Sequence, residues 1–237
     1  MSGFKQFGFG EGEEPEGKSN RFKGVGGASY RVSFAWWPGI EDGDLDLDAQ
    51  TPIFTGAQRN YLPGVGYFLN HGPEYTKIAG NEPPRMAIGT VLIVWPLDSQ
   101  GNLDKAAMQK GEMQVKPWIF SQDKYDSFKP IHKEFPFGSH DMTIQCTDTQ
   151  YQKMTFSPCK ESLLRSIKEK APKHFAKIVE KVASVAGTIQ RDIGRDLTLD
   201  QIREKMSGSG GAARPTSAAP DPQTTEDIDN IVDNLLD

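Results

Sequence analysis

The stretch 86-MAIGTVLIVW-95 belongs to the most apolar part of the chain and contains no charged residue. Its length and its β-branched residues fit one buried strand, whereas a membrane-spanning helix needs about 20 apolar residues. A turn at 98-DSQGN-102 follows, and then a second strand, 113-MQVKPWIFS-121. Pro117 lies inside that second strand and indicates an edge position or a bulge, because proline cannot donate a hydrogen bond to a neighbouring strand.

Strand patterns recur on both sides of this pair. In 28-ASYRVSFAWW-37 the residues alternate, so that Tyr30, Val32, Phe34 and Trp36 share one face. The loop-rich region 51–84 holds one expected strand, 65-VGYFLNH-71. Two more strands, 142–147 and 151–156, are expected to form a hairpin with a turn at Asp148-Thr149.

Helix signals lie at two places. A short helix is expected to begin at Ser121 and to end at Pro130, before the last hairpin. A helical extension follows that hairpin. It comprises 158–170, with Ser157 as cap and Pro158 in the first turn, then 173–191, then 198–206 capped by Thr198.

Five antiparallel strands with a helix between the third and the fourth are the plan of an OB-fold barrel. The predicted fold class is therefore α+β, mainly β. It consists of an OB-fold five-stranded barrel with extra loops and a C-terminal helical extension, followed by a disordered acidic tail.

The chain divides into four segments. We expect a mobile N-terminal arm at 1–25 and a core at 26–206 that includes the helical extension 158–206. A Gly/Ser/Ala-rich flexible linker follows at 207–223, and an acidic tail, TTEDIDNIVDNLLD, occupies 224–237.

The formal net charge of −5 is unevenly distributed. Residues 207–237 carry six acidic residues and Arg214, and the remaining residues carry 26 acidic and 26 basic ones. The body is therefore neutral overall, and a neutral body can still present a basic face.

The signatures of catalysis and of metal binding are weak in this sequence. No phosphate-binding loop, nucleophile elbow or HExxH motif is present, the four histidines are scattered, and Cys146 and Cys159 are too few for a four-cysteine zinc site. We expect no enzyme, no cofactor and no zinc. The segment MSGFKQFGFGEGEEPEG lacks the features of a secretory signal, so a cytoplasmic location without a membrane is expected.

Aromatic residues stand beside basic residues on the predicted strands, a combination that binds single-stranded nucleic acid through base stacking and phosphate contacts. The best single stacking platform is Trp118, because Lys116 shares its face and a lysine-bearing face is rarely the core. Stacking there would quench tryptophan fluorescence. The other candidates are Arg31, Trp37, Arg59, Tyr61, Tyr67, Tyr75, Lys77, Tyr151 and Lys153.

The order of several short motifs resembles that of the single-stranded DNA-binding (helix-destabilising) proteins of T-even-type bacteriophages. The matching pieces are RVSFAWWPG, YFLNHG, GTVLIVWPLDSQGNLDK, VKPWIFSQDKYDSF and MTIQCTDTQYQKMTFSP, together with the acidic end. They cover about residues 28–160 and the tail.

The resemblance implies an OB-fold core that binds single-stranded DNA without marked sequence preference, in phage replication, recombination and repair inside the host cytoplasm. It places Trp118 and Lys116 at a DNA-facing aromatic and base, and Arg85 in a basic lead-in to the long strand. Two features depart from the family. No cysteine follows His71 where the family's zinc ligands lie, so no zinc is expected. The arm is acidic and Phe-rich rather than basic, which puts cooperative binding in doubt.

The tail has two possible uses besides an inert one. Its acidic residues can mimic phosphates in a basic groove, and its aliphatic residues, at near-helical spacing, can dock on replication or recombination partners. The residues concerned are Asp227, Ile228, Asp229, Ile231, Asp233, Leu235, Leu236 and Asp237. Two alternatives to DNA binding remain open: a protein-interaction or virion-assembly module, and an enzyme of unrecognised type.

Overall fold

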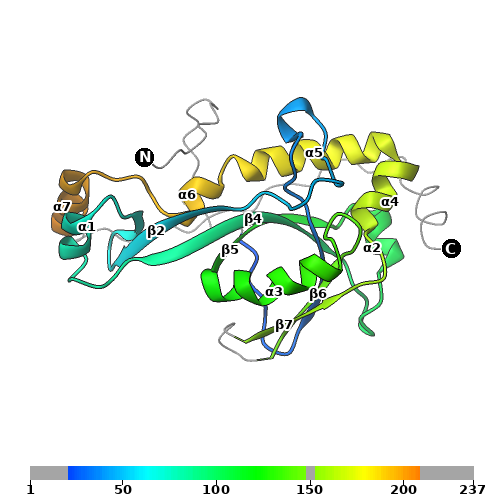
Figure 1. Cartoon of the computed structure of the whole chain (residues 1–237), viewed down its shortest axis with the longest axis horizontal. Coiled ribbons are helices and arrows are strands. Elements are labelled where there is room, and N and C mark those ends of the chain that lie inside the picture. Colours follow the sequence, from blue (N-terminus) through cyan, green and yellow to red (C-terminus); the bar gives the residue numbers. More distant parts are fainter. Residues whose placement is uncertain (1–20, 148–152, 209–237) are drawn as a thin grey trace.

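The central strand of the sheet is β4 (Arg85–Trp95), which contains the apolar stretch that opens the sequence analysis. A computed structural model describes residues 21–147 and 153–208 of the chain. In it β5 (Gln114–Ser121) pairs along almost the whole of β4, from Ala87↔Ser121 to Val94↔Gln114. The opposite edge of β4 is shared by β2 (Thr55–Leu62) near its start and β1 (Ser29–Phe34) near its end. One long strand thus joins both halves of the sheet (Figure 1).

The strands form a seven-stranded sheet in the order β3-β2-β4-β1-β6-β7, with β5 on the other edge of β4. The remaining strands are β3 (Gly66–Leu69), β6 (Met142–Cys146) and β7 (Met154–Pro158), and all these strand pairs are antiparallel. The α+β, mainly antiparallel class is confirmed. The sheet has seven strands rather than the five of the predicted barrel, and within the described residues it does not close.

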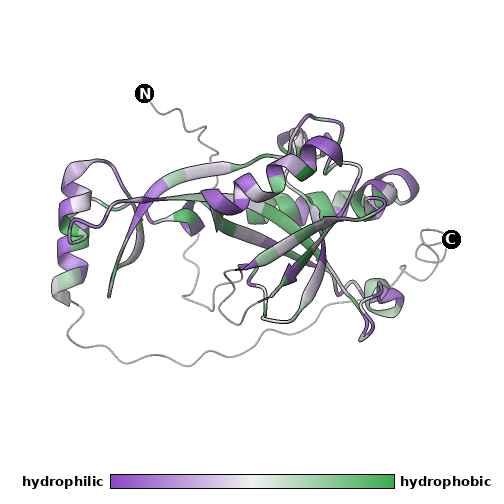
Figure 2. Ribbon diagram, turned by 60° about the horizontal axis from the view of Figure 1, so that its bottom comes forward, coloured by the Kyte–Doolittle hydropathy of each residue, from purple (hydrophilic) through white to green (hydrophobic). Residues whose placement is uncertain are grey.

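Helices cover both faces of the sheet (Figure 1). Adjacent residues on a strand point to opposite faces. A Cβ at Gly89 would meet Ile189 and Ile193 of α6 (Ile189–Ile193), so this face lies under α6. Trp118, the partner of the next residue, Thr90, contacts Phe128 of α3 (Gln122–Glu134) on the other face. The main core contains residues from both the strands and the helices, and the ribbon in Figure 2 shows apolar residues in both.

Strand β2 was not predicted, since its sequence TGAQRNYL has no apolar alternation and only Asn60 in it is buried. It is a strand because β3 and β4 hydrogen-bond to its two edges. Strand formation depends more on such neighbours than on intrinsic propensity. The short helices α1 (Pro73–Ile78), α2 (Lys105–Gln109) and η1 (Ile40–Asp42) were also not predicted.

Helix α3 begins where it was expected but does not end at Pro130, which lies inside it. Proline costs a helix one hydrogen bond. Here the helix continues to Glu134, because Phe128 is buried in the core and Ile131 packs against it. Tertiary packing therefore outweighs the local stop signal.

The helical extension begins later than predicted. Ser157 and Pro158 pair with Thr143 and Met142 in the β6–β7 hairpin, so they do not start a helix. Helix α4 (Leu163–Lys170) starts five residues later, where the Ser162 hydroxyl accepts a hydrogen bond from the Arg165 amide. Helix α5 (Pro172–Ala186) and α6 follow.

Helix α7 (Leu199–Gly208) has the predicted cap: the Thr198 hydroxyl accepts a hydrogen bond from the Gln201 amide, and Gln201 Oε1 accepts one from the Thr198 amide. It packs beside α1 at one end of the molecule, over a small second cluster of buried residues (Figure 1). That cluster consists of Val65, Phe68, Ala79 and Ile202.

The expected N-terminal arm is shorter than 1–25. Phe22 is buried, its amide hydrogen-bonds to the carbonyl of Pro117, and its ring lies edge-on to Trp118. The core therefore includes residues from 21 onward. The linker and the tail lie outside the described residues, apart from Ser207 and Gly208, which belong to α7.

Candidate nucleic-acid interface

Two adjoining hollows make one cleft along the end of the sheet where β5 passes into α3. They share Arg85, Ser121 and Lys124, and their volumes are about 570 Å³ and about 730 Å³. The first reaches the β2–β3 hairpin, and the second reaches the β6–β7 hairpin. We call this surface the hairpin cleft.

Two tyrosines are exposed at the first end of the hairpin cleft. Tyr61 on β2 and Tyr67 on β3 are direct cross-strand partners, with ring centroids 5.0 Å apart. Their exposed fractions, 56% and 44%, are the largest among the Phe, Tyr and Trp residues that the structure describes. Exposed, adjacent rings of this kind can stack with nucleic-acid bases.

Arg59 lies beside the two rings. Its guanidinium carbon is 3.9 Å from the centroid of the Tyr67 ring, and its Nη1 donates a hydrogen bond of 2.7 Å to the carbonyl of Ile193. Burial lowers the pKa of Arg59, with nearby Arg21 acting in the same direction and Tyr67 in the opposite one. Arginine nevertheless stays charged at neutral pH. The tyrosine pair thus has a fixed cation next to it.

A second cation lies directly opposite the first, because Arg59 and Arg85 are cross-strand partners in the β2–β4 register. Like charges in this arrangement are unfavourable unless an anion lies between or near them. The side chain of Arg85 is exposed and forms no ion pair or hydrogen bond with any residue of 21–147 or 153–208. Such a pair of cations is suited to binding a phosphate.

The second hollow continues this basic character. Arg85, Lys124 at the start of α3 and Lys153 before β7 line it, together with hydroxyl groups of Ser121, Ser127, Thr147 and Thr155. Over its full length the hairpin cleft contains four basic side chains, Arg59, Arg85, Lys124 and Lys153, and two acidic ones, Glu82 and Asp123. It therefore combines exposed rings at one end with a basic path leading away from them.

The structure brings five of the twelve candidate residues into this cleft, namely Arg59, Tyr61, Tyr67, Arg85 and Lys153. Lys124 and the exposed side chain of Met86 also line the cleft, although neither was predicted to do so. The signal for Lys124 was available, since the predicted helix from Ser121 places it in the first turn.

Trp118 is wrong as a stacking platform, because its side chain has no exposed surface. It lies on the inner face of β5, within 6 Å of Phe120, Phe128 and Phe22. Lys116 shares that face and is half-buried. The premise that a lysine excludes a core face fails here, since a long lysine side chain can bury its stem and still place its charge in water.

Trp37 is also wrong as a DNA-facing residue. Its side chain is fully buried, and its indole nitrogen donates a hydrogen bond to the carbonyl of Phe34. Strand β1 ends at Phe34, so the alternation that would put Trp36 and Trp37 on opposite faces no longer applies, and both are buried.

Arg31 has a structural partner instead of a free charge. Its Nε donates a hydrogen bond of 2.9 Å to the carboxylate of Asp141, which is 1% exposed. It is not among the residues that line the cleft, and it joins β1 to the segment before β6.

Tyr75 and Lys77 belong to α1 and do not line the hairpin cleft. Tyr75 packs against the second cluster, with its ring edge-on to His71, and Lys77 forms an exposed ion pair with Glu74. Tyr151 and the eight tail residues from Asp227 to Asp237 lie outside the described residues.

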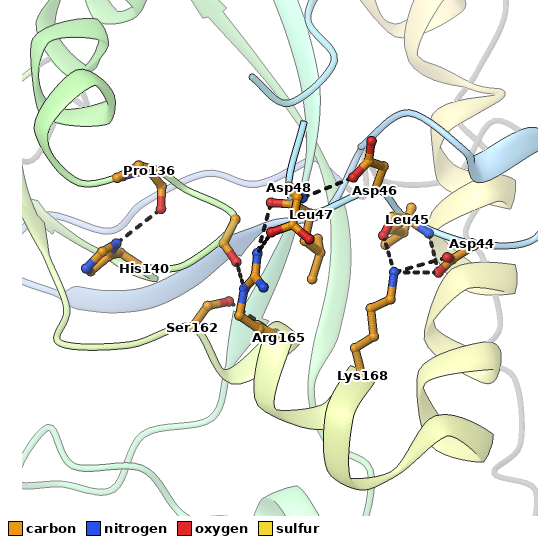
Figure 3. Close-up of polar contacts among 11 residues, drawn as sticks. Asp44, Leu45, Asp46, Leu47, Asp48, Pro136, His140, Ser162, Arg165 and Lys168 are labelled. Atoms are coloured by element: carbon orange, nitrogen blue, oxygen red, sulfur yellow. Dashed lines mark hydrogen bonds and ion pairs between the residues drawn. The ribbon is translucent and has the colours of Figure 1, made fainter. Parts of the chain in front are cut away.

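Basic residues of α4 are engaged elsewhere, as Figure 3 shows. Arg165 forms an ion pair with Asp48 and also donates to the carbonyl of Gly138, and Lys168 forms one with Asp44 and donates to the carbonyl of Leu45. The acidic loop 44–48 therefore neutralises these two cations.

Comparison with known proteins identifies no relative: no family model and no curated protein matches this chain. Among residues 21–147 and 153–208, no group of three or more His, Cys, Asp or Glu side chains is arranged to hold a metal ion. No helix in that part of the chain is long and apolar enough to span a membrane.

Proposed function

We propose that this protein binds single-stranded DNA in the hairpin cleft, without marked sequence preference. The observation that carries the proposal is the exposed Tyr61–Tyr67 pair next to the cross-strand cations Arg59 and Arg85. Bases stack on the rings, and the phosphates follow the cations toward Lys124 and Lys153. Stacking and phosphate contacts do not distinguish one base from another, which is why the binding tolerates any sequence.

The resemblance to phage helix-destabilising proteins supports a role in replication, recombination and repair of phage DNA in the host cytoplasm. In that role the protein is a non-enzymatic coat for exposed strands. An OB-type core is part of the proposal, supported by the strand–helix–hairpin order of β5, α3, β6 and β7. The tail, 224–237, is proposed to recruit partner proteins through its aliphatic and acidic residues.

The test is a titration of fluorescein-labelled oligo-dT at low salt, followed by fluorescence anisotropy. Tryptophan quenching is no longer the method of choice, since all four tryptophans, Trp36, Trp37, Trp95 and Trp118, are buried. We expect a clear rise in anisotropy. Unlabelled single strands should reverse this rise, and duplex DNA of the same length should reverse it less well. No rise at low salt would contradict the proposal.

Site variants locate the binding. Tyr67→Ala should weaken binding about 5- to 150-fold, because stacking of one base on an aromatic ring contributes about 1–3 kcal/mol. Lys177→Gln, which removes an exposed cation of α5 that does not line the cleft, is the matched control and should leave the affinity within about twofold of wild type. If Tyr67→Ala and Lys177→Gln changed the affinity for oligo-dT equally, the binding site would lie outside the hairpin cleft.

A further inference from the structure

The tyrosine pair is held in place by a part of the chain far away in sequence. Tyr67 lies on β3, a strand of four residues whose one edge pairs with β2. The other edge pairs with the backbone of Arg195: the Leu69 amide donates to the Arg195 carbonyl, and the Arg195 amide donates to the Tyr67 carbonyl, both at 3.0 Å. This four-residue strand is therefore hydrogen-bonded along both of its edges.

The same stretch of chain also fixes the cation of the platform. The carbonyl of Ile193 accepts the 2.7 Å hydrogen bond from Arg59, whose guanidinium lies over the Tyr67 ring. A Cβ on Gly194 would come within 3.1–3.2 Å of backbone atoms of Phe68 and Leu69, so the two backbones are in close contact. Ring and guanidinium therefore share one support.

Helix α7 anchors this support from its other end. Ile202 has no exposed surface and packs with Val65, Phe68 and Ala79 in the second cluster. Val65 precedes β3 and Phe68 lies within it, so α7 packs against the strand that carries Tyr67. None of these four residues belongs to the main core, which contains all four tryptophans.

We propose that residues 193–208, the C-terminal segment, position Tyr67 and Arg59 for stacking with a base, and that Ile202 is the positioning residue that keeps the segment docked. This rests on the proposed function. The C-terminal segment touches no nucleic acid itself. It sets the affinity of the hairpin cleft by restricting the β2–β3 hairpin to the geometry in which ring and guanidinium lie together.

The experiment compares Ile202→Ala with Met206→Ala in the full-length chain. Met206 is an apolar residue of the same helix that is 45% exposed, which makes it the matched control. Ile202→Ala should weaken oligo-dT binding about fivefold or more, whereas Met206→Ala should weaken it less than twofold. The conservative variant Ile202→Val should keep most of the wild-type affinity. Tryptophan emission, which reports on the main core, should be unchanged in all three variants.

A double-variant cycle separates positioning from general destabilisation. In a Tyr67→Ala background, Ile202→Ala should have a clearly smaller effect on affinity than in the wild-type background, because the ring, one of the two groups that it positions, is absent. An undiminished effect in that background would overturn the proposal, since the C-terminal segment would then act on something other than Tyr67.

Hydrogen exchange tests the same support without DNA. In Ile202→Ala the amides of Leu69 and Arg195 should exchange at least about tenfold faster, while those of β4 stay protected. Unchanged exchange at Leu69 would overturn the proposal. If the wild-type protein binds no oligonucleotide, the proposed function is wrong. Fast exchange of the Leu69 amide in Ile202→Ala would then still show that the segment supports the hairpin, but for another ligand.

Discussion

Asp141 shows how one residue decides the role of another. Its buried carboxylate accepts hydrogen bonds from the side chains of Arg31 and Ser33 and from the amide of Leu163, and Ser33 in turn accepts one from the indole of Trp95. Burial raises the pKa of the Asp141 carboxyl, and the charge of Arg31 acts in the opposite direction. We therefore expect Arg31 to stabilise the fold through Asp141.

Replacing Arg31 by Met should reduce the free energy of unfolding by about 3–5 kcal/mol, because it leaves a buried carboxyl without its cation. The deficit should shrink at acidic pH: a carboxyl with a raised pKa in the folded state is cheapest to bury when it is protonated. Urea unfolding at pH 7 and pH 4 measures both effects, with Lys177→Met as the control. A reduction of the unfolding free energy by less than about 0.5 kcal/mol at pH 7 would assign Arg31 to the cleft instead. So would a loss of DNA-binding free energy in the folded variant that is as large as the loss of stability expected here.

At the scale of elements, α4 attaches the acidic loop 44–48 to the core (Figure 3). Arg165 and Lys168 bind the two ends of this loop, and Gly138 comes so near the Leu47 carbonyl that a Cβ there would overlap it. An acidic run such as 44–48 is usually only solvated, but here it forms a structural contact. It also engages Arg165 and Lys168 in ion pairs, so neither cation is available to a binding surface.

The Asp44–Lys168 contact makes a small pH-dependent contribution. The hydrogen bond from Lys168 lowers the pKa of Asp44, although burial opposes it. A carboxyl with a lowered folded-state pKa stabilises above its ordinary pKa of 3.8, and this stabilisation is lost as pH falls through the folded value. Because Asp44 is more than half exposed and Lys168 about one third exposed, Asp44→Asn should cost only about 0.3–1 kcal/mol at pH 7, and this cost should disappear once the pH has fallen through the lowered pKa. Urea midpoints across this range check it, and a cost that persists at the acidic end would contradict the assignment.

At the scale of the whole molecule, the proposed binding depends on how a neutral body distributes its charge. Of its 26 basic residues, four line the hairpin cleft, and Arg31, Arg165 and Lys168 are held in ion pairs. A net-acidic chain can therefore bind a polyanion through one local basic path.

The salt dependence of the proposed DNA binding measures how many of these cations contact phosphates. Four phosphate contacts predict a slope of about −3 in a plot of the logarithm of the association constant against that of the salt concentration, from about −0.7 per contact on a single strand. Arg85→Gln should make the slope shallower by about 0.7, and Lys177→Gln should leave it unchanged. A wild-type slope near zero would show that the cations of the cleft make no phosphate contacts.

Local pattern was sufficient for the elements whose signals lie within a few residues. The apolar run of β4, the start of α3 at Ser121 and the Thr198 cap of α7 were all readable in this way. Arg59, Tyr61 and Tyr67 could be picked as aromatic and basic neighbours, but their union in one platform required the pairing of β2 with β3 and β4.

The sequence by itself determined which segments can be strands or helices and which residues have the chemistry to stack on a base or bind a phosphate. Only the tertiary structure decided which of them face solvent. Trp118 and Tyr67 look alike as aromatic strand residues, yet one is fully buried and contacts α3, whereas the other lies on β3 at the end of the sheet with its side chain exposed. The reason is physical: periodicity fixes on which side of a strand a residue lies, whereas burial of that side depends on what packs against it from distant parts of the chain.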